Sequence, residues 1–359
     1  MHVVQVTQSY PPSQGGVENH VEAISTRLVE AGHEVTVVSA DAGTGNRSGT
    51  RNGVTVRRYR SLSPSGAYHF APQVASAISR LEPDVVHAHN YHALLLPFAA
   101  IASSDAKLVV TPHYHGGSES GFRDRLLQLY HPIGQWGLDR ADAVVAVSDW
   151  EREQLLEDFD IEAEVIPNGI DVERFATAEP YDHDRPYLLY VGRLKKYKGV
   201  QHVIRALTEF PEYDLLIAGS GPYRTDLEYI AEQSNVKERA FFFGYVPDGD
   251  LPGLYRGAEA FMALSSFESY GLTVGEALAS GTPCVVLRRG ALIDWGGYEG
   301  VVGVDDVDTM DISKAIEQAR KTSVDSSSIP GWDSHVSQLR GIYHRRIDNS
   351  DQSSGILNQ

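Results

Sequence analysis

Cysteine is almost absent from this chain of 359 residues, since Cys284 is the only one. A single cysteine excludes an intramolecular disulfide and fits a reducing compartment, and we expect Cys284 to be a small core residue. Long hydrophobic runs are also missing, because the longest, 93–102, is too short to cross a bilayer. No basic-then-apolar leader precedes the first short strand. We therefore expect a cytoplasmic protein whose membrane contact is limited to peripheral binding at the inner face.

Positive charge is scarce, with 31 basic residues against 48 acidic ones and a net charge of −17. A chain this acidic repels polyanions, which excludes general nucleic-acid binding. It also disfavours broad attraction to anionic lipids, although a local basic patch, such as Arg57-Arg58 with Arg60 or Arg123 with Arg125, would suffice for peripheral contact. Acidic, lysine-poor surfaces fit a salt-rich cytoplasm, so the composition favours a halophilic source. The lysines are Lys107, Lys195, Lys196, Lys198, Lys237, Lys314 and Lys321.

Three common catalytic fingerprints are missing from the chain. The first strand is not followed by G-x-G-x-x-G, which counts against a nicotinamide-dependent dehydrogenase. Neither a Walker A sequence nor a G-x-S-x-G elbow is present. P-loop hydrolysis and esterase chemistry therefore have no support.

The chain alternates short Val/Ile-rich runs with amphipathic segments, a pattern typical of βαβ units around a parallel sheet. Gly32 is expected to stop the first helix. In the first half we expect helices at 17–31 and 74–81, and strands at 3–6, 34–39, 54–59, 84–89, 108–111, 143–147 and 163–166. In the second half we expect helices at 200–208, 223–233, 251–257 and 274–279, and strands at 187–191, 214–218, 240–243, 260–264 and 284–287.

The segment 171–186 is rich in proline and charge and lacks apolar periodicity, so we expect the joint between two domains there. The predicted fold class is α/β, with doubly wound domains at 1–175 and 185–332. A final amphipathic helix is expected at 333–347, followed by a polar tail at 348–359.

Gly15 and Gly16 open the helix after the first strand. Glycines at a helix N-terminus let backbone N–H groups approach an anion or a sugar hydroxyl. A plain tight turn explains them equally well, so this feature alone assigns no ligand.

A basic loop, Tyr-Val-Gly-Arg-Leu-Lys-Lys-Tyr-Lys-Gly at 190–199, places Arg193 and Lys198 beyond the carboxyl end of a strand. Open α/β sheets bind ligands at that edge. Two cations five residues apart in a glycine-bounded loop suit a diphosphate. The alternative is a solvated basic loop, and the scarcity of lysine elsewhere counts against it.

Two glutamates, Glu268 and Glu276, bracket the segment Ser-Tyr-Gly-Leu-Thr-Val-Gly. Within it, Gly271 and Leu272 would offer backbone amides to an anion at a helix start. Thr273 and Glu276 fit a capping box, which would make Glu276 structural. That alternative leaves Glu268 unexplained, because a carboxylate beside a phosphate site repels the phosphate unless it faces a sugar.

Histidines gather at the ends of two predicted strands, as His87 with His89 and as His113 with His115. Such clusters can bind a metal. No carboxylate or cysteine lies beside them at a zinc-like spacing, so no metal site is assigned. A hydrogen-bonding role for His113 in a substrate cleft is preferred to a metal-binding or core role.

Taken in order, these segments resemble the GT-B glycosyltransferases of family 4, the group 1 retaining enzymes that use nucleotide-sugar donors. The resemblance extends from about residue 3 to residue 347. The matching segments are GGVENHVEAISTRLVEAGHEVTVV (15–38), DVVHAHN (84–90), VVTPHYHG (109–116), ADAVVAVS (141–148), VIPNGIDVERF (165–175), YVGRLKKYKG (190–199), IAGSGP (217–222), FFGYV (242–246) and FESYGLTVGEALASGTPCVV (267–286).

The resemblance implies two Rossmann-like domains facing an interdomain cleft, with the last helix crossing back to the first domain. The donor would bind mainly the C-terminal domain and the acceptor the N-terminal one. Arg193 and Lys198 would hold the donor diphosphate and stabilise the leaving-group charge without a metal, so neither a cofactor nor a metal is expected. In the family's E-x7-E motif, Glu268 would face the transferred sugar and Glu276 would bind the ribose.

Further roles follow from the same resemblance. His113 would contact the donor sugar and belongs, with Glu268, Arg193 and Lys198, to the predicted catalytic set. The remaining predicted donor-binding positions are Gly15 and Gly16 on the phosphate and acceptor side, Gly219 and Gly221 near the base, Tyr245 and Val246 at the base, and Gly271 and Leu272 at the phosphates.

The family keeps the anomeric configuration, either by front-face displacement or through a covalent glycosyl-enzyme on Glu268. One segment departs from the family pattern. Where a Gly-Gly-x-x-Glu element is common, residues 288–295 read Arg-Arg-Gly-Ala-Leu-Ile-Asp-Trp, with Ala291 at the second glycine and Asp294 near the acidic position. Part of the wall that faces the sugar or the acceptor is therefore expected to differ.

The predicted function is that of a hexosyltransferase that moves a hexose-type sugar from a nucleotide-diphosphate sugar to a glycan, a lipid-linked sugar or a small acceptor. Such enzymes act in surface polysaccharide, glycolipid or glycoprotein biosynthesis. Two alternatives remain: a nucleotide-sugar epimerase, and a nucleotide-sugar-binding protein without turnover.

Overall fold

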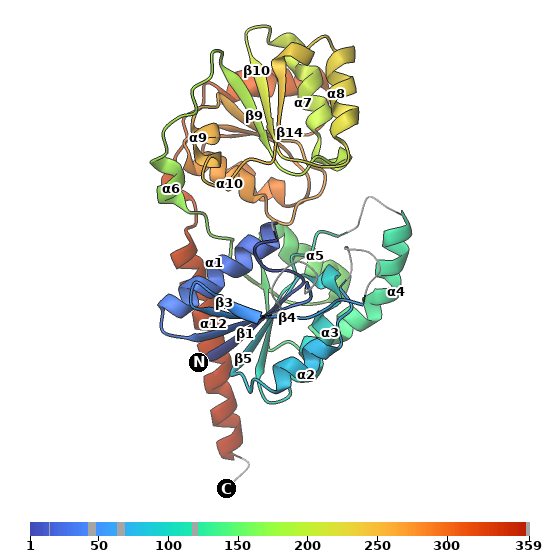
Figure 1. The fold of residues 1–359 in the computed structure, drawn as a ribbon, viewed down its shortest axis with the longest axis vertical. Coiled ribbons are helices and arrows are strands. Elements are labelled where there is room, and N and C mark those ends of the chain that lie inside the picture. Colours follow the sequence, from blue (N-terminus) through green and yellow to red (C-terminus); the bar gives the residue numbers. More distant parts are fainter. Residues whose placement is uncertain (14, 42–47, 63–68, 117–120, 357–359) are drawn as a thin grey trace. The chain divides into compact units, whose positions relative to one another are not determined.

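The computed structural model describes residues 1–13, 15–41, 48–62, 69–116 and 121–356. The chain divides into two compact units (Figure 1). Unit 1 comprises Met1–Asn168 with Trp332–Gln359, and unit 2 comprises Gly169–Gly331. Each unit has its own sheet and its own hydrophobic core.

Unit 1 contains an eight-stranded sheet in the order β3-β4-β2-β1-β5-β6-β7-β8. All its strand pairs are parallel except the one between β3 and β4. The chain reverses its direction of growth between β1 and β5, as in a doubly wound sheet. The strands are β1 (His2–Thr7), β2 (Glu34–Ser39), β3 (Ser48–Arg51), β4 (Val54–Arg58), β5 (Val85–His89), β6 (Lys107–Thr111), β7 (Ala143–Ala146) and β8 (Glu164–Val165).

Helix α1 shows how the sequence pattern becomes packing. Val21, Ile24 and Leu28 recur at helical spacing and are fully buried. Gly32 follows the helix with φ 84°, a conformation that glycine adopts without steric cost. Helix α12 buries Leu339 in the same cluster and lies beside α1 in Figure 1. The helices of unit 1 are α1 (Gly16–Glu30), α2 (Gln73–Ser79), α3 (Leu96–Ala102), α4 (Gly121–Leu138), α5 (Asp149–Phe159) and α12 (Trp332–Ile356), with η1 (Tyr91–Ala93).

Unit 2 contains a six-stranded parallel sheet in the order β11-β10-β9-β12-β13-β14, which reverses between β9 and β12. Its strands are β9 (Tyr187–Val191), β10 (Asp214–Ala218), β11 (Ala240–Gly244), β12 (Ala260–Ala263), β13 (Cys284–Leu287) and β14 (Val301–Val304). Its helices are α6 (Val172–Ala176), α7 (Val200–Ala206), α8 (Arg224–Gln233), α9 (Leu251–Arg256), α10 (Leu272–Ala279) and α11 (Thr309–Ala319), with 3-10 turns η2 (Lys196–Lys198), η3 (Leu207–Glu209), η4 (Lys237–Arg239), η5 (Gly290–Gly297) and η6 (Ser326–Ser328).

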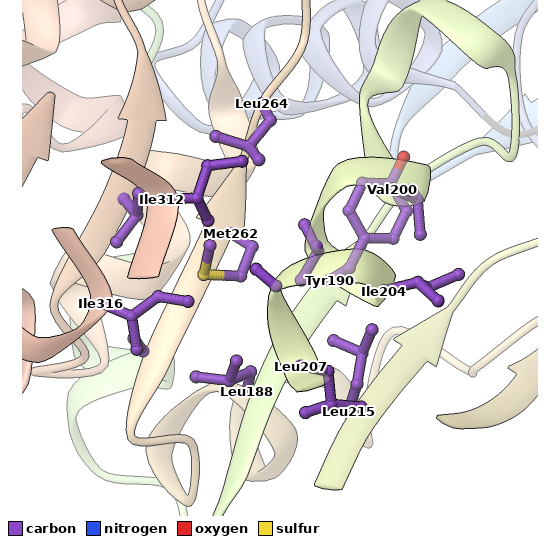
Figure 2. Packing of buried hydrophobic residues seen from close by; sticks show 14 of the residues in the cluster. Leu188, Tyr190, Val200, Ile204, Leu207, Leu215, Met262, Leu264, Ile312 and Ile316 are labelled. Carbon is purple, nitrogen blue, oxygen red and sulfur yellow. The ribbon is translucent and has the colours of Figure 1, made fainter. Parts of the chain in front are cut away.

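The core of unit 2 lies between this sheet and the helices that cover it. Figure 2 shows Leu188 of β9 and Met262 of β12 close to Ile312 and Ile316 of α11. All four side chains are fully buried in one cluster. Cys284 is also fully buried, as the sequence predicted for a small core residue.

Three expectations need correction. The predicted tail at 348–359 continues the helix α12 as far as Ile356. Strand β3 was not foreseen, because all four of its residues are exposed and it has no apolar side. The basic patch proposed at 57–60 loses its central residue, because the Arg58 side chain is buried in an ion pair with Asp41, 2.5 Å away.

Among the described residues, no helix is both long and apolar enough to span a bilayer.

Candidate active site

The point where the unit 2 sheet reverses its order brings two predicted loops together. The loop after β9 and the loop after β12 leave the carboxyl ends of adjacent strands. The Ser266 N–H donates to the Tyr197 carbonyl at 2.9 Å, which joins the two loops through their backbones. This is the place at which doubly wound sheets bind ligands.

Lys198 and Glu268 meet at this point. The Lys198 ammonium forms an ion pair and hydrogen bond with Glu268 Oε1, and both side chains are largely buried. The two residues are 70 positions apart in the chain. The structure thus joins the predicted diphosphate-binding lysine to the predicted sugar-facing glutamate.

Arg193 lies in the same loop but is exposed, with no ion-pair partner in the part of the chain that the structure describes. Its carbonyl accepts a hydrogen bond from the Tyr190 hydroxyl at 2.9 Å. Burial strongly raises the pKa of Tyr190, the Glu268 charge raises it further, and the Arg193 charge opposes both. A neutral tyrosine therefore lies under a loop that carries both charges.

Gly199, which ends the basic loop, has φ 78°. A Cβ at this position would lie 2.2 Å from the Leu264 carbonyl oxygen, so only glycine lets the two loops approach this closely. The approach brings the Lys198 side chain within reach of the loop after β12. The glycine therefore contributes to the site through packing.

The N-terminus of α10 also lies at the end of the loop after β12. Gly271 is the N-cap residue with φ 90°, and no side chain caps the helix. The first amides of a helix have no intrahelical acceptor, so the N–H of Leu272 at the first helical position is available to an anion. Gly271 and Leu272 are thus where the sequence predicted a phosphate-binding helix start.

The structure contradicts the capping-box alternative for Glu276. Thr273 lies inside α10 rather than at its N-cap, so the required spacing does not exist. Instead, Glu276 Oε2 accepts a hydrogen bond from the Tyr255 hydroxyl at 2.8 Å. Burial raises the pKa of Glu276 to about 7, while this hydrogen bond and the charge of Arg174 lower it. Glu276 therefore does not cap α10, and the Tyr255 hydroxyl fixes the position of its carboxyl group.

Gly219 and Gly221 have an explanation that needs no ligand. A Cβ on Gly219 would lie 1.8 Å from the Gly192 carbonyl oxygen, and one on Gly221 would lie 2.2 Å from that of Leu194. The loops after β9 and β10 therefore pack backbone against backbone. Tyr245, beyond β11, is 57% exposed. A role for these residues and for Val246 near the base stays a prediction.

In unit 1, the glycine pair lies at the start of α1, where Gly15 is the N-cap residue. A Cβ on Gly15 would lie 2.2 Å from Glu18 Oε2, so a carboxylate of the same helix occupies this end. Ser9 donates a hydrogen bond to the other oxygen of Glu18. Sequence reasoning missed Glu18, whose carboxylate adds negative charge at this helix start and disfavours a phosphate there. The predicted role of Gly15 and Gly16 on the phosphate and acceptor side stays a prediction.

His113 lies in a buried histidine cluster rather than on an open surface. Ring nitrogens of His20, His89 and His113 lie within 4.8 Å of one another, the one potential metal-binding group among the described residues. His335 of α12 lies 5.2 Å from His20 between ring centroids. His115 lies apart and stacks on another imidazole. The sequence identified His89 and His113, but His20 and His335 come from helices that only the fold brings there.

The clustered imidazoles are neutral. Burial and, to a lesser extent, the nearby His335 together lower the pKa of His113 to about 3. Burial also lowers the pKa of His335 to about 4, opposed by its hydrogen bond to the Pro167 carbonyl at 2.8 Å. His89 Nε2 hydrogen-bonds Gln5 Oε1 at 2.6 Å. The absence of a metal requirement stays a prediction.

Two family profiles cover most of the chain. The profile for Glycosyltransferase Family 4 matches residues 14–174, and the profile for Glycosyl transferases group 1 matches residues 171–322. A glycogen synthase of Mycobacterium tuberculosis is 31% identical over 330 residues, covering 81% of this chain and 79% of that protein. The chain belongs to glycosyltransferase family 4. It is an enzyme of the group 1, GT-B type.

Further relatives of this glycosyltransferase differ in their named substrates. The GDP-mannose-dependent alpha-(1-6)-phosphatidylinositol monomannoside mannosyltransferase of Mycolicibacterium smegmatis is 31% identical over 348 residues, covering 87% of each chain. Among solved structures, Anabaena HepE in complex with UDP has a TM-score of 0.71 at 18% identity and covers 100% of both chains. Sucrose-phosphate synthase from Thermosynechococcus elongatus has a TM-score of 0.71 at 18% identity, with 96% and 99% coverage. These structures confirm the predicted GT-B fold class.

Proposed function

We propose that this glycosyltransferase moves a hexose-type sugar from a nucleoside-diphosphate donor to a hydroxyl of a glycan, lipid-linked or small acceptor, with retention of configuration. The observation that carries the proposal is the Lys198–Glu268 contact at the carboxyl edge of the unit 2 sheet. A cation for the diphosphate and a carboxylate for the sugar are paired where the sheet reverses. The named donors and acceptors of the relatives are consistent with this class.

The residues of unit 2 then have separable tasks. Transfer breaks the bond between the anomeric carbon and the phosphate oxygen, so negative charge grows on the leaving diphosphate. Lys198, Arg193 and the α10 amides at Gly271 and Leu272 offset that charge without a metal. Glu268 faces the sugar, where it stabilises positive charge at the anomeric carbon or acts as a nucleophile. In unit 1, His113 is assigned a hydrogen bond to the donor sugar.

We propose that the acceptor is a glycan or a lipid-linked sugar. The relatives include enzymes named for a phosphatidylinositol mannoside and for glycogen, so lipid-linked and glycan acceptors both fit the family. We keep a cytoplasmic location, with peripheral contact at the inner membrane face for a lipid acceptor, as part of the proposal. The departure at Ala291 and Asp294 is where we expect acceptor or sugar preference to differ from that of relatives.

The test of the proposal is calorimetric binding of UDP, GDP and ADP, in low and in high salt, to wild type and Lys198→Ala. We expect one nucleotide to bind selectively and the variant to lose that binding. Donor turnover then separates the alternatives, since an epimerase alters the donor sugar without an acceptor and a binding protein leaves it intact. A folded protein that binds none of the three would contradict the donor-site assignment.

Glu276 gives a second test within unit 2. Glu276→Ala should weaken binding of the selected nucleotide by roughly tenfold or more, because a hydrogen bond to a charged group contributes about 1.5–3 kcal/mol. The melting temperature should change little, since Glu276 is not a capping residue. Because burial raises the pKa of Glu276 to about 7, wild-type affinity should also rise between pH 6 and pH 8 as the carboxylate ionises.

Tyr255→Phe is the matched variant for this test. It removes the hydroxyl that donates to Glu276 but keeps the buried ring. We expect a smaller loss of affinity than in Glu276→Ala. If the alanine variant unfolds easily while nucleotide affinity survives, Glu276 is structural after all.

A further inference from the structure

The loop after β6 contains a residue other than glycine whose backbone has the left-handed conformation that favours glycine. His113, two positions past Thr111 at the end of β6, has φ 47°. The left-handed region is unfavourable for residues with a Cβ, because that atom crowds the following carbonyl. Contacts of neighbouring groups must therefore hold His113 in this conformation.

Glu151 makes the decisive contact. It is in the first turn of α5, and it has no solvent-exposed surface. Its Oε1 accepts the Tyr114 N–H at 2.5 Å, and its Oε2 accepts the Val147 N–H at 2.7 Å. The Tyr114 N–H belongs to the peptide group that follows His113. A hydrogen bond to it therefore fixes the orientation of that peptide and, with it, the backbone of His113.

Local sequence alone would give Glu151 a different partner. Ser148 and Glu151 fit a capping box, and the Ser148 hydroxyl does accept the Glu151 N–H at 3.0 Å. In that motif the glutamate would return to the amide of the capping serine. Here its two oxygens instead bind Val147, before the cap, and Tyr114, which is 37 residues earlier in the chain. A helix cap does not require the second of these bonds.

Tyr114 is anchored at its other end as well. Its hydroxyl donates to Asp158 Oδ2 at 2.6 Å, and its ring packs against Phe159 with 5.1 Å between ring centroids. Both partners are in α5, the helix that carries Glu151. The loop after β6 is thus attached to one helix through a backbone amide and a side chain.

We propose that Glu151 is a positioning residue that sets the backbone conformation of His113, the residue assigned to the donor sugar. This inference rests on the proposed function, which gives His113 a hydrogen bond to that sugar. The carboxylate touches no substrate. It acts by holding the peptide after His113, so its loss should affect recognition of the sugar and spare recognition of the nucleotide.

The test compares two ligands of one nucleotide, UDP with UDP-glucose or GDP with GDP-mannose, in calorimetric titrations. The dissociation constant of the diphosphate divided by that of the nucleotide sugar measures what the sugar adds to binding. We expect His113→Ala to reduce this ratio by about threefold to tenfold, the range for one neutral hydrogen bond. Glu151→Gln, which keeps the size but loses one acceptor, should reduce it by roughly threefold while the diphosphate itself binds as before. Glu153→Gln removes an exposed charge of the same helix and should change neither.

A double variant shows whether Glu151 acts through His113. In the His113→Ala background, Glu151→Gln should cause no further change in the ratio. An additional loss there, or an equal loss of diphosphate binding, would mean a general structural role and would overturn the inference. Should Glu151→Gln not fold, Glu151→Asp keeps the carboxyl group but is too short to bridge both amides, and the same result is expected from it.

Failure of the proposed function gives a different outcome. If neither nucleotide binds, or if His113→Ala leaves the ratio unchanged, the assigned role of His113 is wrong and the inference fails with it. If His113→Ala lowers the ratio and Glu151→Gln does not, the proposed function stands and only the inference is wrong.

Discussion

Replacing Lys198 with alanine should reduce transfer at least about a hundredfold. The Lys198 ammonium is the partly buried cation that pairs with Glu268 at the carboxyl edge of the unit 2 sheet. Removal of one preorganised donor to a developing negative charge typically costs about a hundredfold to a thousandfold in rate. Here the loss has a second component, because the variant leaves the Glu268 carboxylate unpaired beside the diphosphate.

The two components can be separated. In the double variant Lys198→Ala with Glu268→Gln, the repulsive charge is gone, so nucleoside-diphosphate affinity should recover in part although transfer stays low. Lys198→Arg keeps a cation and should lose less than the alanine variant. Lys196→Ala is the matched control, because Lys196 is an exposed lysine of the same loop.

The measurement is kcat/KM for nucleotide release from the donor that binds, with water or a screened acceptor. Arg193→Ala should show a comparable loss, because Arg193 is the second cation that we assign to the donor diphosphate. Near-normal rates in both Lys198→Ala and Arg193→Ala would remove the physical basis for placing the diphosphate at this edge.

Unit 1 should lose stability steeply as the pH falls from about 7 to about 5. Burial lowers the pKa of His335 to about 4 and of His113 to about 3, against an ordinary value near 6.5. Burial also lowers the pKa values of His20, His87 and His89. Below pH 6.5 the unfolded chain therefore binds more protons than the folded one, so acid favours unfolding.

The size of this effect follows from linkage. Each histidine that stays neutral in the folded state lowers the free energy of unfolding by up to about 1.4 kcal/mol per pH unit. His113 and His335 alone can thus remove several kcal/mol, out of about 5–15 kcal/mol for a typical domain. The loss begins near pH 6.5 and continues toward the lowered pKa values.

Hydrogen exchange monitored by mass spectrometry at pH 8, 7, 6 and 5 can resolve the two units, after correction for the intrinsic rate. Opening of β1, β5 and α12 should become easier at low pH than opening of β9 and β12. His335→Gln should make the dependence shallower, and His344→Gln, at an exposed position of the same helix, should leave it unchanged. Equal behaviour of both units would show that the cluster does not dominate acid sensitivity.

The strands with the strongest apolar pattern were predicted correctly, because that pattern depends only on neighbouring residues in the sequence. Strands β2, β9, β10 and β13 have the predicted bounds, since fully buried parallel strands show continuous runs of Val, Ile and Leu. Strand β3 has no buried residue and pairs only at the sheet edge, so no periodicity marks it. Its existence depends on the neighbouring strand β4.

In the candidate site as well, the sequence identified some features and only the structure shows others. Arg193, Lys198, Glu268 and Glu276 could be singled out by residue type and by their position after a strand or in a helix. The role of Glu276 could not, because Thr273 and Glu276 satisfy the spacing of a capping box although the helix begins at Leu272. The position of the helix start and the hydrogen bond from the Tyr255 hydroxyl exclude the capping box, and ribose binding by Glu276 stays a prediction.

By itself, the sequence determined the acidic charge, the alternation of strands and helices, the family and the residue types beside each strand end. These properties depend on neighbours along the chain. The tertiary structure decided the Lys198–Glu268 pair, the histidine cluster from α1, β5, the loop after β6 and α12, and the reach of Glu151 to the Tyr114 amide. These contacts join residues tens to hundreds of positions apart, and the order of strands in the sheets, which local periodicity does not encode, brings them together.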